Sequence, residues 1–293
     1  MRLKGGIEAL ERTRGGRVLV LAATALELDL LPILYERLRE MGPTERLDVL
    51  LWCRGGQVGA ARRIGLLLHQ FTQRLAFIVP DRCESAGTLL VLAGREVAAS
   101  PIAVFSRVDP QLDSGAPGGP GAIAAEDVRL FAEMAERWFG LAPAEAGADA
   151  LSTLSANVFP TALTAFYRAT LETESVCAEL LALGIPDSPA ETRASIAAAL
   201  LRGHHSHTFP LAPFDLARLG LPISGRDADE ADRRAESAAE EIAAALRRAI
   251  GPRARRSEAD GWTDALVATG AGCSLRKRLP GAPGAEWTSG ATE

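Results

Sequence analysis

Two short apolar segments of this sequence each end in a polar turn, and each turn opens a segment with helical spacing. The first segment, residues 47–53, leads through a turn with two adjacent glycines into a helix predicted over 58–71. The second, residues 75–80, leads through a serine-containing turn into a helix predicted over 85–94. Strands as uniformly apolar as these are typical of a parallel sheet covered on both faces. The repeated pattern therefore restricts the chain to an α/β fold.

A third unit of the same kind precedes these two. Residues 17–23 form an apolar run and 26–41 a helical pattern, which gives the order β-α-β-α-β-α with right-handed connections. Further strand material follows at 97–108, and then a glycine- and proline-rich loop at 113–121. The remaining helical patterns cover 124–141, 160–183, 188–201 and 227–250. We therefore predict a parallel β-α-β core followed by a helical carboxyl half.

We expect four segments along the chain. Residues 1–16 are polar and glycine-bearing and are expected to be a lead-in segment, while 17–223 form the main domain. Residues 224–252 hold the last helix, whose alanine-rich stripe fits close packing within the subunit or against another one. Residues 253–293 are polar and glycine-rich apart from one apolar patch, so we expect a tail that is partly disordered.

Size, charge and cysteine content exclude several classes of protein. A chain of 293 residues holds one large domain or two modest ones. Its formal charge of −5 argues against a nucleic-acid binder, because no dense basic face offsets it. The four cysteines lack C-x-x-C spacing, which predicts free thiols in a reducing compartment and no metal site. The sequence shows neither a signal-peptide-like start nor an apolar stretch of about 18 residues, so we expect a cytoplasmic protein without a membrane span.

The two polar turns carry the candidate chemistry. The carboxyl ends of neighbouring parallel strands meet at one edge of a sheet, where open α/β sheets form their sites. Ser85 lies at the start of a predicted helix, whose N-terminus favours a developing negative charge, and the Gly55-Gly56 turn offers N–H groups to an oxyanion. Each feature alone is weak, because a glycine pair often marks a tight turn and serine is a common N-cap. Together they predict acyl transfer at a serine nucleophile.

Several motifs in one order resemble the Clp-type serine peptidase superfamily with its crotonase-like fold. The closest branch is the serine dehydrogenase proteinase family, which is related to signal peptide peptidase A. In chain order the motifs are LDVLLWCRGGQVGAARRIGLLL, DRCESAGTLLVLAG, VDPQL, PTALTAFYR and a late run SHTFPL that precedes a short helix and GL. The resemblance covers residues 17–223. It implies a serine peptidase with peptide or protein substrates and no cofactor, working as a homo-oligomer, a trimer or a hexamer, with a further partner protein left open.

The family pattern assigns roles to individual residues. By position, Ser85 corresponds to the nucleophile, and Gly56 and Ala86 to the residues whose N–H groups bind the oxyanion. The proteolytic subunit of Clp has a histidine near the position of Asp109, and this chain has none there. The late run, close to where that subunit places its acid, contains His207. We therefore predict a rearranged triad in which His207 takes the proton from Ser85 and Asp109 orients the imidazole.

Elimination also favours the histidine of the late run as the base. Of the other three, His69 falls late in an apolar helix and fits a core or surface role, while His204 and His205 precede the matched run. Lysine is the base in the signal-peptide-peptidase branch. Here it occurs at Lys4 and Lys277, in ends that we expect to be flexible.

Two departures from the family pattern lie in the glycine turn. Arg54 stands where the family has proline, and Gln57 where an acidic or apolar residue is common. Proline would fix φ and stiffen the turn, whereas Arg54 adds a charge at the mouth of the site. We predict that Arg54 and Gly55 contact the substrate. Either Arg54 binds a substrate carboxylate, or the turn is no longer shaped for peptide hydrolysis.

Two alternatives to a peptidase stay open. The first is a catalytically weak or inactive Clp-fold protein that serves as an oligomeric scaffold or binds peptides. The second is a crotonase-type acyl-CoA enzyme, whose glycine turns stabilise an enolate. This second alternative is disfavoured, because such an enzyme does not need the Ser-Ala-Gly-Thr setting of Ser85.

Overall fold

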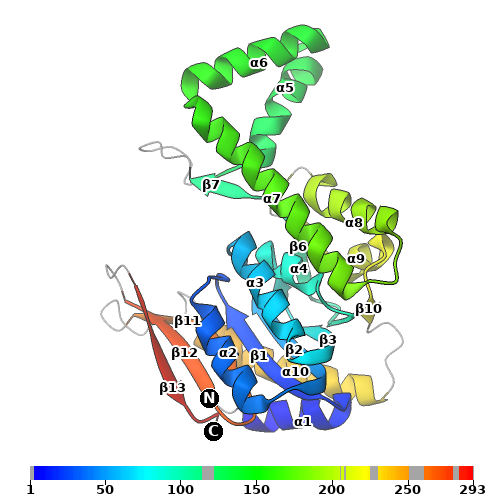
Figure 1. The fold of residues 1–293 in the computed structure, drawn as a ribbon, viewed down its shortest axis with the longest axis vertical. Helices are drawn as coiled ribbons and strands as arrows, with labels where there is room; N and C mark the ends of the chain where they lie inside the picture. Colours follow the sequence, from blue (N-terminus) through cyan, green and yellow to red (C-terminus); the bar gives the residue numbers. More distant parts are fainter. Residues whose placement is uncertain are drawn as a thin grey trace.

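The computed structural model describes residues 3–113, 122–204, 206–207, 209–224, 230–250, 261–279 and 284–292. These residues form a mixed α/β molecule built on an 11-stranded sheet (Figure 1). The main path of the sheet runs in the order β10 (Ile223–Ser224), β5 (Glu96–Ala99), β3 (Thr72–Val79), β2 (Thr44–Cys53), β1 (Arg17–Ala23), β11 (Trp262–Ala268), β12 (Cys273–Arg278) and β13 (Ala285–Gly290).

The predicted parallel β-α-β core is confirmed. Strands β10, β5, β3, β2 and β1 are parallel neighbours, and β11, β12 and β13 extend the sheet in antiparallel fashion. The connections between core strands contain α2 (Leu30–Met41), α3 (Val58–His69) and α4 (Ala86–Val91). These helices follow the same strands that the apolar segments predicted.

The sheet branches at the carboxyl end of β2, and this branch assembles the site. The short strand β4 (Arg82–Cys83) pairs with β2, and β6 (Val104–Ser106) pairs with β4. The strand β9 (Pro210–Leu211) pairs with β6. The branch therefore brings the late run of the sequence beside the two polar turns that follow β2 and β3.

Both faces of the core strands are buried, and alternate residues enter different hydrophobic layers. In β1, Leu19 and Leu21 pack with the layer that holds α2, α3 and α4. Val18 and Val20 pack on the opposite layer, with α1 (Lys4–Arg14) and α10 (Glu230–Ala249). This alternation follows from the two-residue period of a strand, and it explains why every position of β1 is apolar after its first residue.

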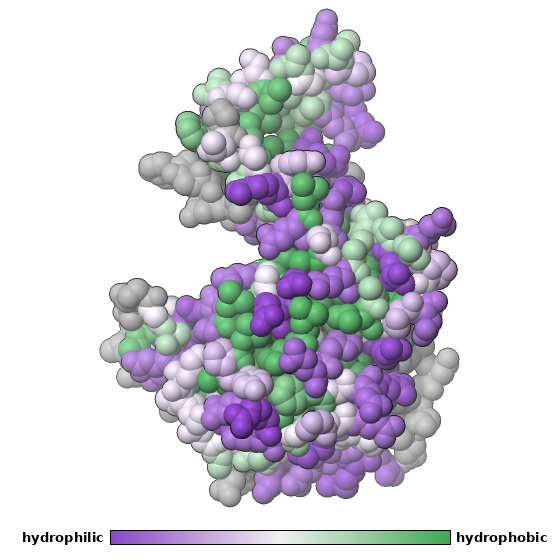
Figure 2. Space-filling view, in the orientation of Figure 1, coloured by the Kyte–Doolittle hydropathy of each residue, from purple (hydrophilic) through white to green (hydrophobic). Residues whose placement is uncertain are grey.

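An arm projects from the sheet and consists of α5 (Ala125–Phe139), α6 (Pro143–Asn157) and the first half of α7 (Pro160–Gly184) (Figure 1). Sequence patterns did not predict α6, because alanine occupies most of its apolar positions. Figure 2 shows apolar residues gathered on the arm. The exposed large apolar side chains there include Trp138, Phe139, Leu151, Phe159 and Tyr167.

The remaining elements surround the base of the arm. The second half of α7 returns to the sheet and packs on α3 and α4. Helices α8 (Ala190–Arg202) and α9 (Pro213–Leu219) follow it, and β7 (Gln111–Asp113) pairs with β8 (Ala122–Ala124) beside α5. None of the described helices is both long and apolar enough to cross a membrane.

The expectation of a lead-in segment at residues 1–16 is wrong for the part that the structure describes. Helix α1 buries Leu3, Ile7 and Leu10 against α10, and its glycines do not prevent the helix. Gly6 allows close packing, because a Cβ there would lie 2.9 Å from Ile242. The same contact buries the alanine stripe of α10, so the stripe packs within the subunit.

The described part of residues 253–293, where we expected a partly disordered tail, forms β11, β12 and β13. Two of the basic residues in this segment share a buried partner. Arg276 and Arg278 both pair with Asp264 of the neighbouring strand. Residues 251–260, 280–283 and 293, and the predicted loop residues 114–121, lie outside the described residues.

Candidate active site

Ser85 lies between β4 and α4 in a strained backbone conformation. Its φ of 52° makes it the one non-glycine residue with positive φ in the described part of the chain. Such a conformation costs about 1–3 kcal/mol and persists where the surroundings hold it in place. Ser85 occupies the N-cap position of α4, yet its side chain makes no capping hydrogen bond. The ordinary role of a serine at a helix start is therefore not the role of Ser85.

A small polar network holds this backbone. The N–H of Ser85 donates to Ser106 Oγ over 2.8 Å, and Ser106 Oγ donates to the carbonyl oxygen of Arg107 over 3.2 Å. The N–H of Ser106 in turn donates to Thr88 Oγ1, and the Thr88 hydroxyl donates to the carbonyl of Cys83. Neither Ser106 nor Thr88 was predicted as a site residue. The sequence feature that could have indicated them is a hydroxyl side chain among apolar neighbours.

The glycine turn faces Ser85 and requires both of its glycines. Gly55 and Gly56 have φ values of 138° and 134°. A Cβ on Gly55 would lie 3.4 Å from Ser85 Cβ, and one on Gly56 would lie 2.3 Å from the main-chain nitrogen of Leu26. Leu26 fixes the turn with two hydrogen bonds, from its N–H to Gly55 O (2.8 Å) and from Gln57 N–H to its carbonyl (2.9 Å).

The turn and the helix each present a free N–H group. Gly55 C=O and Gly56 N–H belong to one planar trans peptide unit, so the Gly56 N–H points away from Leu26. Ala86 is the first residue of α4, and the N–H groups of a first helical turn have no intrahelical acceptor. Within the described residues neither N–H has a hydrogen-bond partner. Two such donors near a serine are the components of an oxyanion hole.

A cavity of about 360 Å³ lies where the arm meets the carboxyl ends of the strands. Its lining comes from the glycine turn and the first residue of α3, Ser85, residues 108–111, α7 and the late run. The lining residues are Arg54, Gly55, Gly56, Gln57, Val58, Ser85, Val108, Asp109, Pro110, Gln111, Ala169, Glu172, Thr173 and His207. All of the site residues expected from the sequence except Ala86 therefore line one cavity, and Ala86 lies buried beside Ser85.

Asp109 is almost completely buried in this cavity wall. Its Oδ2 has no hydrogen-bond partner, and its Oδ1 lies 3.8 Å from Arg107 Nη2. Burial raises the pKa of Asp109 from 3.8 to about 6, while the positive charge of Arg107 opposes this rise. The carboxylates of Glu126 and Asp127 add to the rise. A neighbouring cation or hydrogen-bond donor would therefore stabilise the ionised form of Asp109.

His207 lines the same cavity. Its buried Nδ1 has no hydrogen-bond partner. Burial lowers the pKa of His207 below 6.5, and Arg107 lowers it further, while Glu84 opposes the shift. The imidazole is therefore neutral at pH 7, as a general base must be. Within the described residues no hydrogen bond joins His207 to Ser85 or to Asp109, so the predicted triad stays a prediction.

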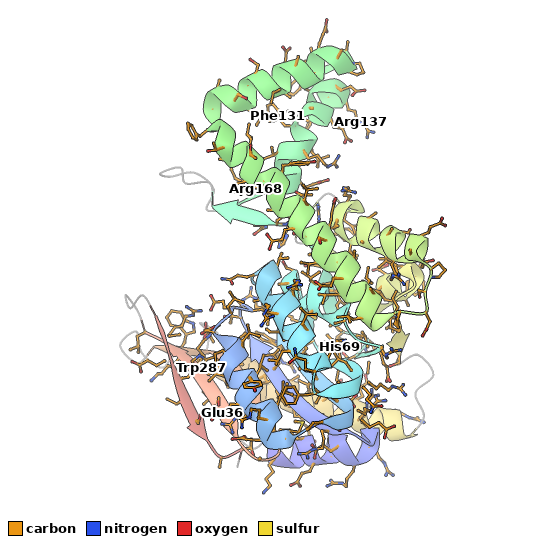
Figure 3. The ribbon with its side chains drawn as sticks, in the orientation of Figure 1. Glu36, His69, Phe131, Arg137, Arg168 and Trp287 are labelled. Carbon is orange, nitrogen blue, oxygen red and sulfur yellow. The ribbon has the colours of Figure 1, made fainter. Side chains whose placement is uncertain are left out.

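The other candidate bases have structural roles or lie elsewhere. His69, on α3 (Figure 3), has its Nε2 2.8 Å from the carbonyl oxygen of Ala93, which confirms the satisfied histidine that the sequence favoured. His204 stacks on Phe209 with ring centroids 4.2 Å apart, and His205 lies outside the described residues. The two lysines were expected in flexible ends, but Lys4 is the first residue of α1 and Lys277 lies within β12. Neither of them lines the cavity.

Arg107 is a site residue that sequence reasoning missed. Its side chain is 1% exposed, and it donates to the carbonyl oxygens of His204 (2.6 Å) and Leu201 (2.5 Å). It thereby ties the end of α8 to the segment that carries Asp109. An arginine two residues before a candidate acid, at the end of an apolar run, was the available signal.

The thiols near the site are inert. Cys53 and Cys83 are fully buried neighbours on β2 and β4. Burial raises the pKa of Cys53 to about 12 and that of Cys83 well above its usual value. Both are protonated near neutral pH, so neither competes with Ser85 as a nucleophile.

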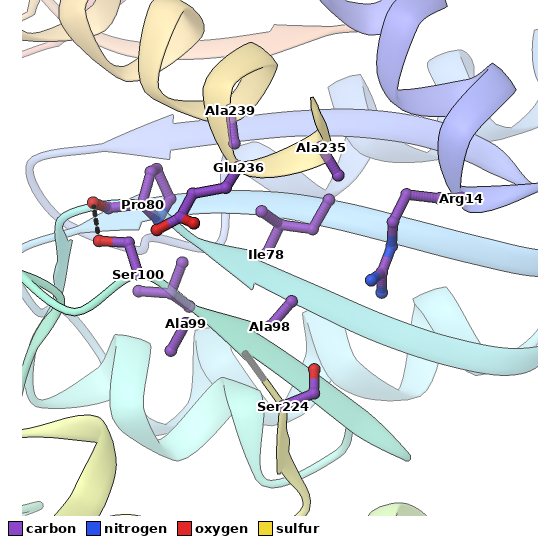
Figure 4. Close-up of a pocket in the computed structure, with 11 residues that line it drawn as sticks. Arg14, Ile78, Pro80, Ala98, Ala99, Ser100, Ser224, Ala235, Glu236 and Ala239 are labelled. Atoms are coloured by element: carbon purple, nitrogen blue, oxygen red, sulfur yellow. Dashed lines mark hydrogen bonds between the residues drawn. The ribbon is translucent and has the colours of Figure 1, made fainter. Parts of the chain in front are cut away.

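A second, smaller cavity lies between β3, β5 and α10, on the face of the sheet that α10 covers (Figure 4). Its volume is about 50 Å³, and its walls are mostly alanine, valine and isoleucine. The guanidinium of Arg14 at its edge is already paired with Asp48 and Glu96. We assign no role to this cavity.

No family model matches the chain, and no curated protein matches it in sequence. Among solved structures it is similar to a mutant of the 1510-N membrane-bound stomatin-specific protease, with 15% identity, coverage of 71% of this chain and 76% of that chain, and a TM-score of 0.43. A second mutant of that protease, in complex with a substrate peptide, shows 13% identity, coverage of 92% and 84%, and a TM-score of 0.41. A candidate enoyl-CoA hydratase from Streptomyces coelicolor A3(2) shows 16% identity, coverage of 80% and 70%, and a TM-score of 0.37. With TM-scores this low, function has to be argued from the site itself.

Proposed function

We propose that this protein is a serine peptidase of the Clp and signal-peptide-peptidase type, within the serine dehydrogenase proteinase family. The observation that carries the proposal is the conformation of Ser85. Its backbone is strained, its side chain is not used as a helix cap, and it faces a glycine turn whose free N–H is oriented by Leu26. The motifs of the sequence support the same class.

The proposed reaction uses the cavity residues in two stages. Ser85 Oγ attacks the scissile carbonyl while His207 takes the hydroxyl proton, and the N–H groups of Gly56 and Ala86 bind the oxyanion. The imidazolium then gives its proton to the leaving amine, which departs from the acyl-enzyme. A water molecule, deprotonated by the same imidazole, attacks the ester and releases the carboxylic acid and Ser85. Asp109, ionised, stabilises the imidazolium.

This mechanism makes a geometric demand. A serine hydroxyl transfers its proton over a hydrogen bond of about 3 Å, so His207 must reach Ser85 Oγ when substrate is bound. Arg54 lies exposed on the cavity lining. We propose that it binds a carboxylate of the peptide substrate.

The second candidate function is a catalytically inactive peptide-binding scaffold with the same fold. The absence of hydrogen bonds among Ser85, His207 and Asp109 in the described structure favours it. Labelling with a fluorophosphonate probe separates the two functions, because the probe reacts with an activated serine. We expect wild type to be labelled and Ser85→Ala not to be labelled. An unlabelled wild-type protein that still binds peptides would establish the scaffold.

We also propose a cytoplasmic homo-oligomer of at least three subunits. The alanine stripe of α10 is buried within the chain and gives no support, whereas the exposed aromatic residues of the arm do, since large exposed apolar areas mark interfaces. Four unpaired thiols are compatible with a reducing compartment. Light scattering at micromolar concentration tests the assembly, and a monomer only would contradict it.

A further inference from the structure

The loop at residues 24–29 lies between the glycine turn and the carboxyl-terminal strands. On one side Leu26 fixes the glycine turn by the two hydrogen bonds described above. On the other side Arg276 of β12 holds the loop. Its Nη1 donates to Glu27 Oε2 and to Asp29 Oδ1, each over 2.7 Å, and its Nη2 donates to the carbonyl oxygen of Ala25 over 3.3 Å.

Two peptide units connect this guanidinium to the Gly56 N–H. Ala25 C=O, which accepts from Arg276, belongs to the same planar unit as Leu26 N–H. Leu26 N–H donates to Gly55 C=O, which belongs to the same unit as Gly56 N–H. A donor at Arg276 therefore sets the orientation of both units in turn. It also polarises them, because hydrogen bonds in a chain strengthen one another in surroundings of low dielectric constant.

The guanidinium itself is fixed. Arg276 is fully buried, and its Nε donates to Asp264 Oδ1 over 2.8 Å. The ring of Trp287 on β13 (Figure 3) lies 5.8 Å from the guanidinium carbon, and the Trp287 indole N–H donates to Asp29 over 3.3 Å. A buried cation is retained only where it is paired in this way. The neighbouring Arg278 shares Asp264 and Glu27 but makes no described contact with the main chain of the loop.

We propose that Arg276 is a positioning residue of the oxyanion hole, acting through Leu26 on the N–H of Gly56. The inference rests on the proposed peptidase function and deepens it. Strands β12 and β13 lie outside the segment that resembles the peptidase family. The proposal makes them a functional part of the site.

The test compares Arg276→Gln with Arg278→Gln in the full chain. Turnover of a fluorogenic peptide gives kcat and KM, and a peptide aldehyde, whose adduct with Ser85 places an oxygen at the oxyanion hole, gives a transition-state-like affinity. We expect Arg276→Gln to lower kcat and aldehyde affinity about tenfold each, less than the about 100-fold or greater loss for removing a donor outright. KM should stay within about twofold. Arg276→Lys, which keeps the charge, should recover part of the loss, and Arg278→Gln should keep wild-type kcat.

Thermal unfolding checks that the variants fold. If Arg276→Gln does not, Arg276→Gln with Asp264→Asn removes the charge of a buried carboxylate that has lost one of its two arginine partners and keeps only Arg278. Asp29→Asn, whose side chain is 43% exposed, weakens one bond to Arg276 by removing the carboxylate charge, at little risk to the fold, and should lower kcat in the same direction, by less.

The outcomes separate this inference from the proposed function. A wild-type protein that does not react with fluorophosphonate refutes the peptidase, whatever the variants do. A reactive wild type with unchanged kcat in folded Arg276 variants and in Asp29→Asn refutes the inference alone. Equal losses in the Arg276 and Arg278 variants would also refute it, because they would reflect the shared ion pairs and not the contact with Ala25.

Discussion

Gly56 is the position where one added methyl group tests the site most directly. Its φ of 134° is rarely adopted by other residues, and an added Cβ would lie 2.3 Å from the nitrogen and 2.4 Å from the oxygen of Leu26. Both are main-chain atoms held in hydrogen bonds to the turn, so the turn itself has to move. We expect Gly56→Ala to displace the oxyanion donor and to lower kcat about 100- to 1000-fold, or about 2.7–4 kcal/mol.

Gly59, three residues further along the chain, provides the matched control. It lies in α3, where an added Cβ would meet nothing within 4 Å. Gly59→Ala should keep wild-type kcat and stabilise the protein by up to about 1 kcal/mol through helix propensity. Peptide turnover, fluorophosphonate labelling rates and thermal unfolding of both variants check these expectations. A Gly56→Ala protein with wild-type kcat would refute the assignment of this turn to the oxyanion hole.

The remaining predictions concern Ser85, the histidines and Asp109. Ser85→Ala should lose all probe labelling and hydrolysis with an unchanged circular dichroism spectrum; hydrolysis at the wild-type rate would refute the peptidase. His207→Ala should lower kcat about a thousandfold, as loss of a triad member does. His204→Ala should cost far less, because that ring stacks on a neighbour instead of lining the cavity; equal losses would place the base elsewhere. Because burial lowers the pKa of His207, kcat/KM should rise with pH with a midpoint below 6.5, and a midpoint above 7 would contradict a neutral base. Burial raises the pKa of Asp109 from 3.8 to about 6, so the folded protein favours the protonated carboxyl group. This preference stabilises the fold below pH 4, and as the pH rises through 6 the free energy of unfolding falls by about 3 kcal/mol. Asp109→Asn should therefore raise the Tm at pH 7.5, leave it nearly unchanged at pH 4 and lower activity; a lower Tm at pH 7.5 would contradict the raised pKa.

The parallel core and its two polar turns could be predicted because local sequence patterns indicate them, whereas Asp109 and His207 were assigned through the resemblance to the peptidase family. An apolar run such as Arg17–Ala23 can be satisfied only by burial on both faces, and a strand that ends in glycines or serine leaves its polar turn at the sheet edge. The strand and helix that follow each other along the chain then fix where Ser85 and Gly56 lie.

The supporting residues could not be predicted, because their roles arise from contacts between distant segments. The buried position of Arg107 depends on carbonyl groups at the end of α8, nearly one hundred positions later. Arg276 fell in the segment expected to be a partly disordered tail, because its acidic partners Glu27 and Asp29 stand near the start of the chain. Helix α1 was misjudged for the same reason, because its apolar stripe is meaningful only against α10.

The placement of Arg276 has a consequence during synthesis. A ribosome produces Ser85 and the glycine turn long before it produces β12, with a delay of about 10 to 40 s at ordinary rates of translation. Throughout that interval the emerging chain carries the nucleophile without the guanidinium that orients the oxyanion donor. Strand β11 pairs with β1, and the N–H of Leu3 donates to the carbonyl oxygen of Thr292, so these contacts form only after residue 292 has been made. In the proposed peptidase, full activity would therefore follow the synthesis of β12 and its packing beside the loop at residues 24–29.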